Sequence, residues 1–419
     1  MRTSSFLVAL AFASILGTNI RTLSAGENWP QFRGPDGQGH AAGTDLPLTW
    51  SETEHIRWKT PIHDRGWSSP VVWGNQVWLT TATPEGKKLY AMCIDLATGR
   101  IVRDIKVFDV ENPADTRQYN SYASPTPAIE EGRVYVHFGS YGTACLDTAT
   151  GNKLWERRDL PCNHFRGPGS SPVIFENLLL LDFDGYDYQY VIALDKQTGD
   201  TVWKTDRTVD YQTSDGDMKK SFSTPLVIEA AGRWQMISPC SKAALAYDPR
   251  TGKELWRIRH TGYSSAARPV FDGGMLLINT GFGKADLLAV RPDGEGDVTK
   301  TKIAWKATKG IGSKPSPVVV DGLVFVVTDG GVATCLDLKT GKEVWNHRLG
   351  GEFSASPIAA GDRVYFCNEN GKTTVVKAGR VYEELAANTL DDGCKASPAA
   401  VGNSLILRTK QALYRIEGP

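Results

Sequence analysis

Several features are missing from this sequence, and each absence excludes a class of protein. The 419 residues carry no excess of charge, because 47 basic side chains face 47 acidic ones. Neutralising nucleic-acid phosphates needs a basic excess, so no nucleic-acid partner is expected. Beyond roughly the first thirty residues no apolar run is long enough to span a bilayer, so no transmembrane segment is predicted. With 41% hydrophobic residues the chain can still fill a core, which excludes a disordered protein.

Motifs for metal, redox and hydrolase chemistry are also missing. None of the seven cysteines is adjacent to another or forms a Cys-x-x-Cys pair, so a disulfide scaffold is not expected. The seven histidines form no His-x-x-x-His pair, and Gly-x-Ser-x-Gly does not occur. The oxygen-rich segments 182–187 and 293–297 lack the glycine and the terminal glutamate of an EF-hand loop. No metal site is predicted, and catalytic residues stay unknown.

The N-terminus has the features of a signal peptide. Arg2 supplies a positive start, an apolar run covers residues 6–16, and the small residues Ser24 and Ala25 follow. We expect a signal peptide over residues 1–25 and a soluble exported protein, periplasmic or extracellular. The first cysteine is Cys93, so no lipid anchor on a mature N-terminal cysteine is expected.

Internal repeats dominate the remaining chain. The phrase Asp-x-x-Thr-Gly begins at Asp95, Asp147, Asp195, Asp248 and Asp337. Four residues after each of its glycines stand Arg103, Trp155, Trp203, Trp256 and Trp345. A second phrase, a proline after a small residue and before an apolar stretch, recurs at Pro70, Pro125, Pro172, Pro225, Pro269, Pro317, Pro357 and Pro398, with Arg268 in place of the small residue at the fifth. Eight starts predict eight units of about 45 residues, a length typical of propeller blades.

Each unit contains a strand pattern. In the sixth, apolar stretches at 318–320, 323–327, 332–336 and 343–347 are separated by Asp-Gly turns and by the Asp-x-x-Thr-Gly loop. We therefore predict an all-β, eight-bladed propeller of four-stranded antiparallel blades over residues 55–419. An extended N-terminal arm over residues 26–54 precedes it.

The recurring loop and tryptophan are expected to dock the blades. Asp and Thr can bond neighbouring backbone amides, glycine allows the left-handed conformation, and the indole on the outer strand can cover the gap to the next blade. The residues given this role are Trp58, Asp147, Gly151, Trp155, Asp195, Gly199, Trp203, Asp248, Gly252, Trp256, Trp305, Asp337, Gly341 and Trp345.

Ring closure follows from an uneven strand count. The last unit has only three strands, at 399–401, 404–409 and 412–417, whereas residues 56–60 form an orphan strand that carries Trp58. Pairing the two would complete the last blade and leave no open sheet edge at the seam.

These motifs resemble a known superfamily. The pattern Ala-x-Asp-x-x-Thr-Gly-x-x-x-Trp at 193–203 and 246–256 is similar to the docking motif of pyrroloquinoline quinone (PQQ) repeat propellers. Segments 29–35 and 65–70 are similar to exported PQQ-like proteins of planctomycete-type bacteria. The superfamily includes quinoprotein alcohol dehydrogenases and the assembly factor BamB. The resemblance implies the propeller fold over the mature chain and leaves activity open.

The resemblance to dehydrogenases also implies a cofactor site, which this sequence does not match. In that family a tryptophan and a disulfide of adjacent cysteines sandwich the quinone, beside Ca²⁺ bound by Glu and Asn and a catalytic Asp. This chain has no adjacent cysteines and no Cys-x-x-Cys-His haem site. No cofactor is expected, and PQQ with Ca²⁺ stays an alternative without residue matches.

Segments before the blade-opening prolines should converge at the propeller axis. They carry basic and aromatic residues, of which we select Arg65, Trp67, Arg166, Lys220, Arg268 and Lys314 as candidate ligand-binding residues of a central funnel. Asp64, Asp215, Asp217 and Glu352 lie in the same segments, so ordinary surface ion pairing is the alternative.

The sequence thus favours a non-catalytic binding or scaffold module of the cell envelope. Its loops vary on a rigid disc, which suits the binding of an envelope protein or polysaccharide. We expect a monomer. The two alternatives are a PQQ-dependent oxidoreductase and a module that binds carbohydrate or anionic polymers.

Overall fold

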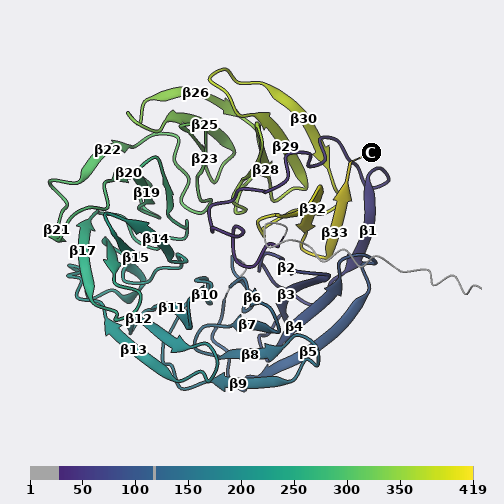
Figure 1. The fold of residues 1–419 in the computed structure, drawn as a ribbon, viewed down its shortest axis with the longest axis horizontal. Helices are drawn as coiled ribbons and strands as arrows, with labels where there is room; N and C mark the ends of the chain where they lie inside the picture. Colours follow the sequence, from purple (N-terminus) through teal and green to yellow (C-terminus); the bar gives the residue numbers. More distant parts are fainter. Residues whose placement is uncertain (1–27, 117–118, 419) are drawn as a thin grey trace, which may run out of the picture.

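The computed structural model describes residues 28–116 and 119–418, and the predicted signal peptide lies outside them. Eight antiparallel sheets stand around a central axis like the blades of a propeller (Figure 1). Within the described residues, no helix has the length and apolar character needed to cross a bilayer. The predicted all-β, eight-bladed fold is confirmed.

Each blade runs from a short inner strand to a long outer strand. In the first four blades the strands are β2 (Val71–Trp73), β3 (Gln76–Ala82), β4 (Lys88–Asp95) and β5 (Ile101–Asp109); β6 (Ala128–Glu130), β7 (Arg133–His137), β8 (Thr143–Asp147) and β9 (Lys153–Arg157); β10 (Val173–Phe175), β11 (Leu178–Asp184), β12 (Gln189–Asp195) and β13 (Thr201–Asp206); β14 (Leu226–Ala230), β15 (Arg233–Cys240), β16 (Ala243–Tyr247) and β17 (Glu254–Arg259).

In the last four blades the strands are β18 (Val270–Asp272), β19 (Met275–Asn279), β20 (Leu287–Val290) and β22 (Ile303–Ala307); β23 (Val318–Val320), β24 (Leu323–Val327), β25 (Val332–Asp337) and β26 (Glu343–Arg348); β27 (Ile358–Ala360), β28 (Arg363–Cys367), β29 (Lys372–Lys377) and β30 (Glu384–Thr389); β31 (Ala399–Val401), β32 (Ser404–Arg408), β33 (Ala412–Glu417) and β1 (Ile56–Pro61). A two-residue strand, β21 (Gly296–Asp297), adds to the edge of β17 in parallel. A short 3₁₀ helix, η2 (Gly216–Met218), precedes β14.

The inner strand of the second blade begins two residues later than the repeat predicted. This strand, β6, begins at Ala128, so Thr126 and Pro127 occupy the positions that Ser69 and Pro70 occupy before β2. The blade-opening proline is therefore Pro127, and the prediction of Pro125 is wrong by two residues. The doubled Ser-Pro-Thr-Pro sequence offers two matches, and only strand pairing distinguishes them.

The hydrophobic core lies between neighbouring blades. Val71 and Trp78 of the first blade pack with Val134 and Val136 of the second in one buried cluster, and the other clusters also join adjacent blades. Because every blade buries both faces, its middle strands are apolar almost throughout. All seven cysteines are buried and unpaired.

The first strand lies in the last blade. β1 pairs antiparallel with β33, with Trp58 opposite Arg415 and Thr60 opposite Leu413. The β1 strand occupies the outer position of the sheet formed by β31, β32 and β33 (Figure 1). The ring is therefore joined across the two ends of the propeller sequence.

Tryptophans of the outer strands connect five of the eight blades directly to the next blade. Each indole Nε1 donates a hydrogen bond of 2.8–3.0 Å to a carbonyl in the outer hairpin loop of the following blade at Trp58, Trp155, Trp203, Trp305 and Trp345. The indole also packs on the loop glycine, since an added Cβ would meet the ring at Gly99, Gly199, Gly252 and Gly341.

The hairpin loop is shaped by its aspartate. Asp147 Oδ1 accepts hydrogen bonds from the backbone N–H of Ala149 and from both the N–H and the hydroxyl of Thr150. Gly151 follows with φ at 79°, a left-handed conformation that favours glycine. The same hydrogen bond, from the backbone N–H of the loop threonine to the aspartate carboxylate, forms at Asp95, Asp195, Asp248 and Asp337.

In the part of the chain that the structure describes, the first and fourth blades contact the next blade without a direct hydrogen bond from an indole to its loop. Arg103 stands where the tryptophan is expected, and its guanidinium donates to the carbonyl of Ala149 in the second blade. Trp256 donates to Gln235 Oε1 at 2.6 Å, and Gln235 Nε2 donates to the carbonyl of Pro292 at 2.8 Å. The fifth blade lacks the usual loop sequence, so a glutamine extends the contact.

The N-terminal arm crosses the propeller axis (Figure 1). Trp29 pairs with Val72 in the first blade, and Gln38 Oε1 accepts the N–H of Phe271 in the fifth blade, which lies opposite. Further along, the arm reaches the junction of the seventh and eighth blades. There Trp50 is buried, and its backbone N–H donates to Asn388 Oδ1 at 2.8 Å. The arm therefore fills the axis and then a seam whose outer strand, β30, carries no tryptophan.

Candidate functional site

The loops that lead into the inner strands converge at one end of the axis and enclose a cavity of about 490 Å³. Antiparallel order places these loops on the face opposite the Asp-x-x-Thr-Gly hairpins. Phe32 of the arm also lines the cavity. The arm bonds to Val72 and Phe271, which lie further along the inner strands than the cavity residues, so it crosses beneath them.

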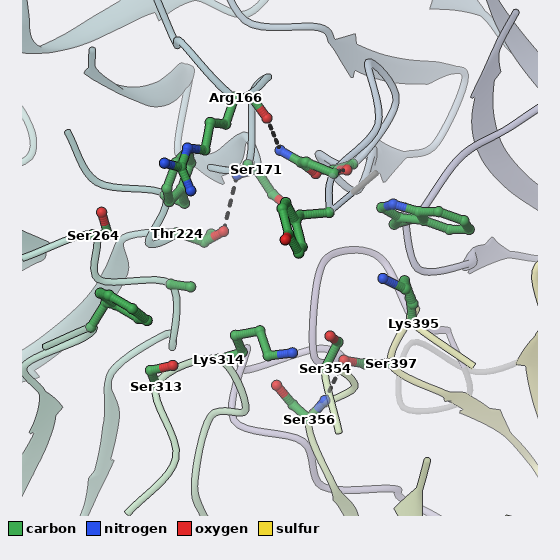
Figure 2. A pocket seen from close by; sticks show the side chains of 18 of the residues that line it. Arg166, Ser171, Thr224, Ser264, Ser313, Lys314, Ser354, Ser356, Lys395 and Ser397 are labelled. Atoms are coloured by element: carbon green, nitrogen blue, oxygen red, sulfur yellow. Dashed lines mark hydrogen bonds between the residues drawn. The ribbon is translucent and has the colours of Figure 1, made fainter. Parts of the chain in front are cut away.

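Positive side chains outnumber negative ones in the cavity lining. The cations are Arg166, Lys220, Lys314 and Lys395, and Figure 2 labels Arg166, Lys314 and Lys395. The lining carboxylates are Asp217 and Asp329, and both already have partners. Asp217 lies 3.5 Å from Arg166 and pairs with Lys220, whereas Asp329 accepts hydrogen bonds from Ser313. The lining therefore favours an anion.

Lys220 is the buried cation of the cavity. Its Nζ bonds to the carboxylate and carbonyl of Asp217 and lies 3.1 Å from Ser264 Oγ. Burial lowers the pKa of Lys220, while the Asp217 carboxylate opposes this shift. Its ammonium also lies 5.6 Å from the Phe222 ring centroid, within cation–π range.

A third carboxylate stands behind the cavity wall. Glu369 lies 3.4 Å from Lys314 Nζ and 3.2 Å from Lys395 Nζ. Burial opposes ionisation of Glu369, but a hydrogen bond from Ser354 and the two lysine charges outweigh it and lower its pKa. The carboxylate therefore holds the ammonium groups of two lining residues, Lys314 and Lys395, close to each other at the cavity wall.

Aromatic side chains supply flat walls. The Lys395 Nζ lies 5.4 Å from the Trp67 ring centroid, and Tyr263 and Phe282 pack edge to face with centroids 5.6 Å apart. Phe282 and Tyr119 are 58% and 75% exposed, so both rings are accessible at the cavity. Rings beside cations suit a ligand that has both charge and a flat or apolar body.

A ring of hydroxyl groups surrounds the axis at the base of the cavity. In seven of the eight blades, the residue before the blade-opening proline donates its backbone N–H to the hydroxyl of the equivalent residue in the next blade, at 2.9–3.0 Å. The exception is Thr224, because its counterpart in the next blade is Arg268, which has no hydroxyl. In blade order the ring consists of Ser69, Thr126, Ser171, Thr224, Arg268, Ser316, Ser356 and Ser397. Ser397 bonds to Ser69, so the ring closes from the last blade to the first.

Arg268 was predicted to line the central funnel, but it does not line the cavity. It is fully buried in the hydroxyl ring, where arginine replaces a serine. Its guanidinium donates to the carbonyls of Pro225 and Phe32 and to Gln31 Oε1. Burial lowers the pKa of Arg268 to about 10 and leaves it charged at neutral pH. The side chain therefore ties the arm beneath the cavity.

The other selected residues lie at or near the cavity. Trp67, Arg166, Lys220 and Lys314 line it, whereas Arg65 lies beside it with its guanidinium 5.2 Å from the Trp67 ring centroid. The selection omitted Lys395, although it precedes Pro398 in the same way that Lys314 precedes Pro317. The hydroxyl ring was also missed, because the recurring residue before proline was described only as small.

The described residues do not match the cofactor arrangement of quinoprotein dehydrogenases. No cysteines are paired, and residues 28–116 and 119–418 contain no group of three or more His, Cys, Asp and Glu side chains placed to hold a metal. The cavity cations could meet the carboxylates of a quinone, but the disulfide and the calcium ligands have no counterpart.

Comparison with known sequences identifies relatives over part of the chain. Residues 108–233 and 289–391, more than half of the sequence, match the family described as outer membrane protein assembly factor BamB. Tetrathionate hydrolase of Acidithiobacillus ferrooxidans is 24% identical over 253 residues, which are 58% of this chain and 49% of that protein. BamB of Yersinia pestis is 24% identical over 192 residues, 46% of each chain. The matches thus span about half the length of these relatives.

Solved structures share the fold. Quinohemoprotein alcohol dehydrogenase from Comamonas testosteroni superposes with a TM-score of 0.66 at 14% identity, covering 97% of this chain and 83% of that one. BamB from Moraxella catarrhalis gives 0.56 at 13% identity, covering 80% of this chain and 98% of that one. At such identities the likeness concerns the fold alone.

Proposed function

Because the chain belongs to the family described as outer membrane protein assembly factor BamB, we propose that it is an exported, non-catalytic binding module of the cell envelope. Its partner is an envelope protein or polysaccharide that presents an anionic segment to the mouth of the central cavity. The observation that carries this proposal is the lining itself, in which four cations outnumber two carboxylates, and they still outnumber the carboxylates when Glu369 behind the wall is counted.

The fold supports such a role. Blade docking and the arm hold the cavity loops on a rigid disc, which lowers the entropy lost when a partner binds. Attraction between the cationic mouth and an anionic segment would speed association and weaken with added salt. The oxidoreductase alternative is less favoured, because the residues do not match the disulfide and calcium ligands of that chemistry.

The proposal is tested with two polyanions of stated chemistry, a poly-glutamate peptide and polygalacturonate. We expect at least one to bind the purified mature protein, and the double variant Lys314→Gln/Lys395→Gln to raise its Kd about tenfold. Lys339→Gln is the matched control, because Lys339 is exposed in a hairpin loop of the opposite face. Equal binding by all three proteins would contradict the proposal.

The same preparation tests the alternatives. Binding of polygalacturonate alone would identify a carbohydrate partner, and binding of the peptide alone an acidic protein segment. Added PQQ with Ca²⁺ is expected to leave the absorbance spectrum of the cofactor unshifted. A shifted band with alcohol oxidation would instead establish the quinone-dependent enzyme.

A further inference from the structure

The hydroxyl ring at the base of the cavity has unused hydrogen-bond donors. Each hydroxyl oxygen accepts a backbone N–H from the preceding blade, which leaves its own hydrogen free to donate. Six ring hydroxyls line the cavity, and among the described residues none of them donates to a protein acceptor: Ser69, Thr126, Ser171, Thr224, Ser356 and Ser397. Their side chains are nearly fully buried, so few water molecules compete for these donors.

Two buried cations lie beneath the ring. Arg268 and Arg33 are both fully buried, and the charge of the nearby Asp36 raises the pKa of each without outweighing the effect of burial. Arg33 donates to the carbonyls of Pro317 and Pro357, each of which directly follows a ring serine. Burial lowers the pKa of Arg33 to about 9, so it stays protonated at neutral pH. Two cations whose hydrogen-bond acceptors are neutral therefore lie below six hydroxyl donors that line the cavity.

We infer that the hydroxyl ring is an oxyanion site: it binds the sulfonate, phosphate or carboxylate head group of a small organic ligand. The six hydroxyls line one cavity, and the acceptors beneath them at Pro225, Phe32 and Gln31 already receive hydrogen bonds from Arg268. The body of the ligand then lies between Trp67, Phe222 and Phe282 on the cavity walls. Lys314 and Lys395 line the same cavity and would add positive charge beside the head group (Figure 2).

This site deepens the proposed function, on which it rests, because it uses the floor of the same cavity. The two sites have separable side chains. A polyanion at the mouth needs the lysines and not the ring, whereas a small oxyanion at the floor needs the ring hydroxyls as well. A neutral ligand of the same shape lacks the charge that the ring and the buried arginines select.

The test uses benzenesulfonate as the charged probe and methyl phenyl sulfone as its neutral counterpart, with calorimetry on the mature protein. We expect benzenesulfonate to bind, inorganic sulfate to compete with it, and the sulfone to bind at least tenfold more weakly. Phenylphosphonate and benzoate, run in the same way, distinguish the three head groups. The double variant Ser356→Ala/Ser397→Ala is expected to raise the Kd of benzenesulfonate about tenfold or more.

Ser316 provides a matched control. Its hydroxyl accepts the N–H of Arg268 in the same ring, but the side chain does not line the cavity. Ser316→Ala should therefore lose the same backbone bond and leave the Kd within twofold. Ser397→Thr keeps the hydroxyl in a form already found at Thr126 and Thr224, and it should also retain binding.

The outcomes separate the two proposals. If benzenesulfonate does not bind, or if the ring double variant binds it as tightly as the native protein while circular dichroism shows both folded, the oxyanion site is wrong. Loss of polyanion binding in Lys314→Gln/Lys395→Gln would in that case still support the binding module. Equal loss in Ser316→Ala and in the double variant would show a structural effect and would also overturn the site.

Discussion

The indole of Trp203 packs on Gly252 of the neighbouring blade and donates from Nε1 to the carbonyl of Pro249 at 3.0 Å. A Cβ added to Gly252 would lie 2.7 Å from Cδ2 of that indole. One contact thus combines apolar packing, a hydrogen bond and a glycine without which the ring would not fit. Its repetition around the propeller explains why the phrase Asp-x-x-Thr-Gly-x-x-x-Trp recurs.

Removing the indole should destabilise the propeller strongly. Trp203 is 9% exposed, so Trp203→Ala should lower the free energy of unfolding by about 3–5 kcal/mol. Urea unfolding followed by circular dichroism measures this. Val202→Ala is the control, because Val202 is 50% exposed on the same strand and should cost less than about 0.5 kcal/mol. Equal effects of the two substitutions would place the indole outside the blade interface.

The glycine can be tested against another glycine of the same backbone conformation. Gly252 and Gly232 have φ angles of 70° and 73°, but an added Cβ meets Trp203 only at Gly252 and no atom within 4 Å at Gly232. Both alanine substitutions should cost about 1–2 kcal/mol from backbone strain. Gly252→Ala should cost more, and most of the extra loss should disappear in a Trp203→Ala background, in which the hydroxyl of Thr205 is the remaining close neighbour of the added Cβ. Identical losses would show that the indole does not press on the loop.

A buried pair of carboxylates should make stability depend on pH. Arg207 bonds to both carboxylate oxygens of Asp184, at 2.5 and 2.7 Å, whereas Asp182 Oδ1 is buried without a partner among the described residues. Burial raises the pKa of Asp182 to about 7, against the charge of Arg207 and with added repulsion from Asp184. An aspartate in the unfolded chain titrates near pH 3.9.

The folded chain therefore keeps a proton that the unfolded chain releases between about pH 4 and 7. The free energy of unfolding should fall as pH rises through this window, by at most ~1.4 kcal/mol per pH unit. Asp182→Asn should remove this decrease in stability, because asparagine does not titrate. Its amide oxygen can still accept the hydrogen bond from Ser238, so the site should stay intact. Asp206→Asn, at an exposed site, should leave the decrease unchanged. A pH profile that Asp182→Asn does not alter would show that this carboxyl does not titrate here.

Arg268 should hold the arm in place. Arg268→Ser restores the serine of the other blades but removes the bonds to Phe32 and Gln31. We expect hydrogen exchange of the amides at 34–39 to accelerate at least tenfold, with little change in β18. Arg259→Ser, at a half-exposed outer-strand position, should have no such effect. Unchanged exchange in the arm would show that other contacts suffice to seat it.

The repeated parts of the fold were predictable because each blade repeats the same local chemistry. The strands expected at 318–320 and 323–327 correspond to β23 and β24, since Asp-Gly turns and β-branched runs fix their limits within a few residues. The prediction for the second blade was wrong at Pro125, because the local sequence pattern fitted two registers. There the backbone pairing of β6 with β7 determines the register.

The site was less predictable, because it depends on single residues that break the repeat. Arg268 was chosen as a funnel residue for its charge, yet its partners Gln31 and Phe32 lie more than 230 positions away in the sequence. No local pattern places an arm across an axis. The sequence does contain the signal for the hydroxyl ring, a serine or threonine that recurs before the blade-opening prolines. A hydroxyl that recurs at equivalent positions around an axis predicts a repeated hydrogen bond between neighbouring blades.

Because the arm crosses the axis beneath the cavity and contributes Phe32 to its lining, we expect the cavity to open at one end only. A small molecule on the floor has to leave by the path through which it entered. A large partner seated over the mouth would then trap that molecule, and dissociation would follow a compulsory sequence, first the large partner and then the small one. The residence time of the small molecule would therefore be set by its cover.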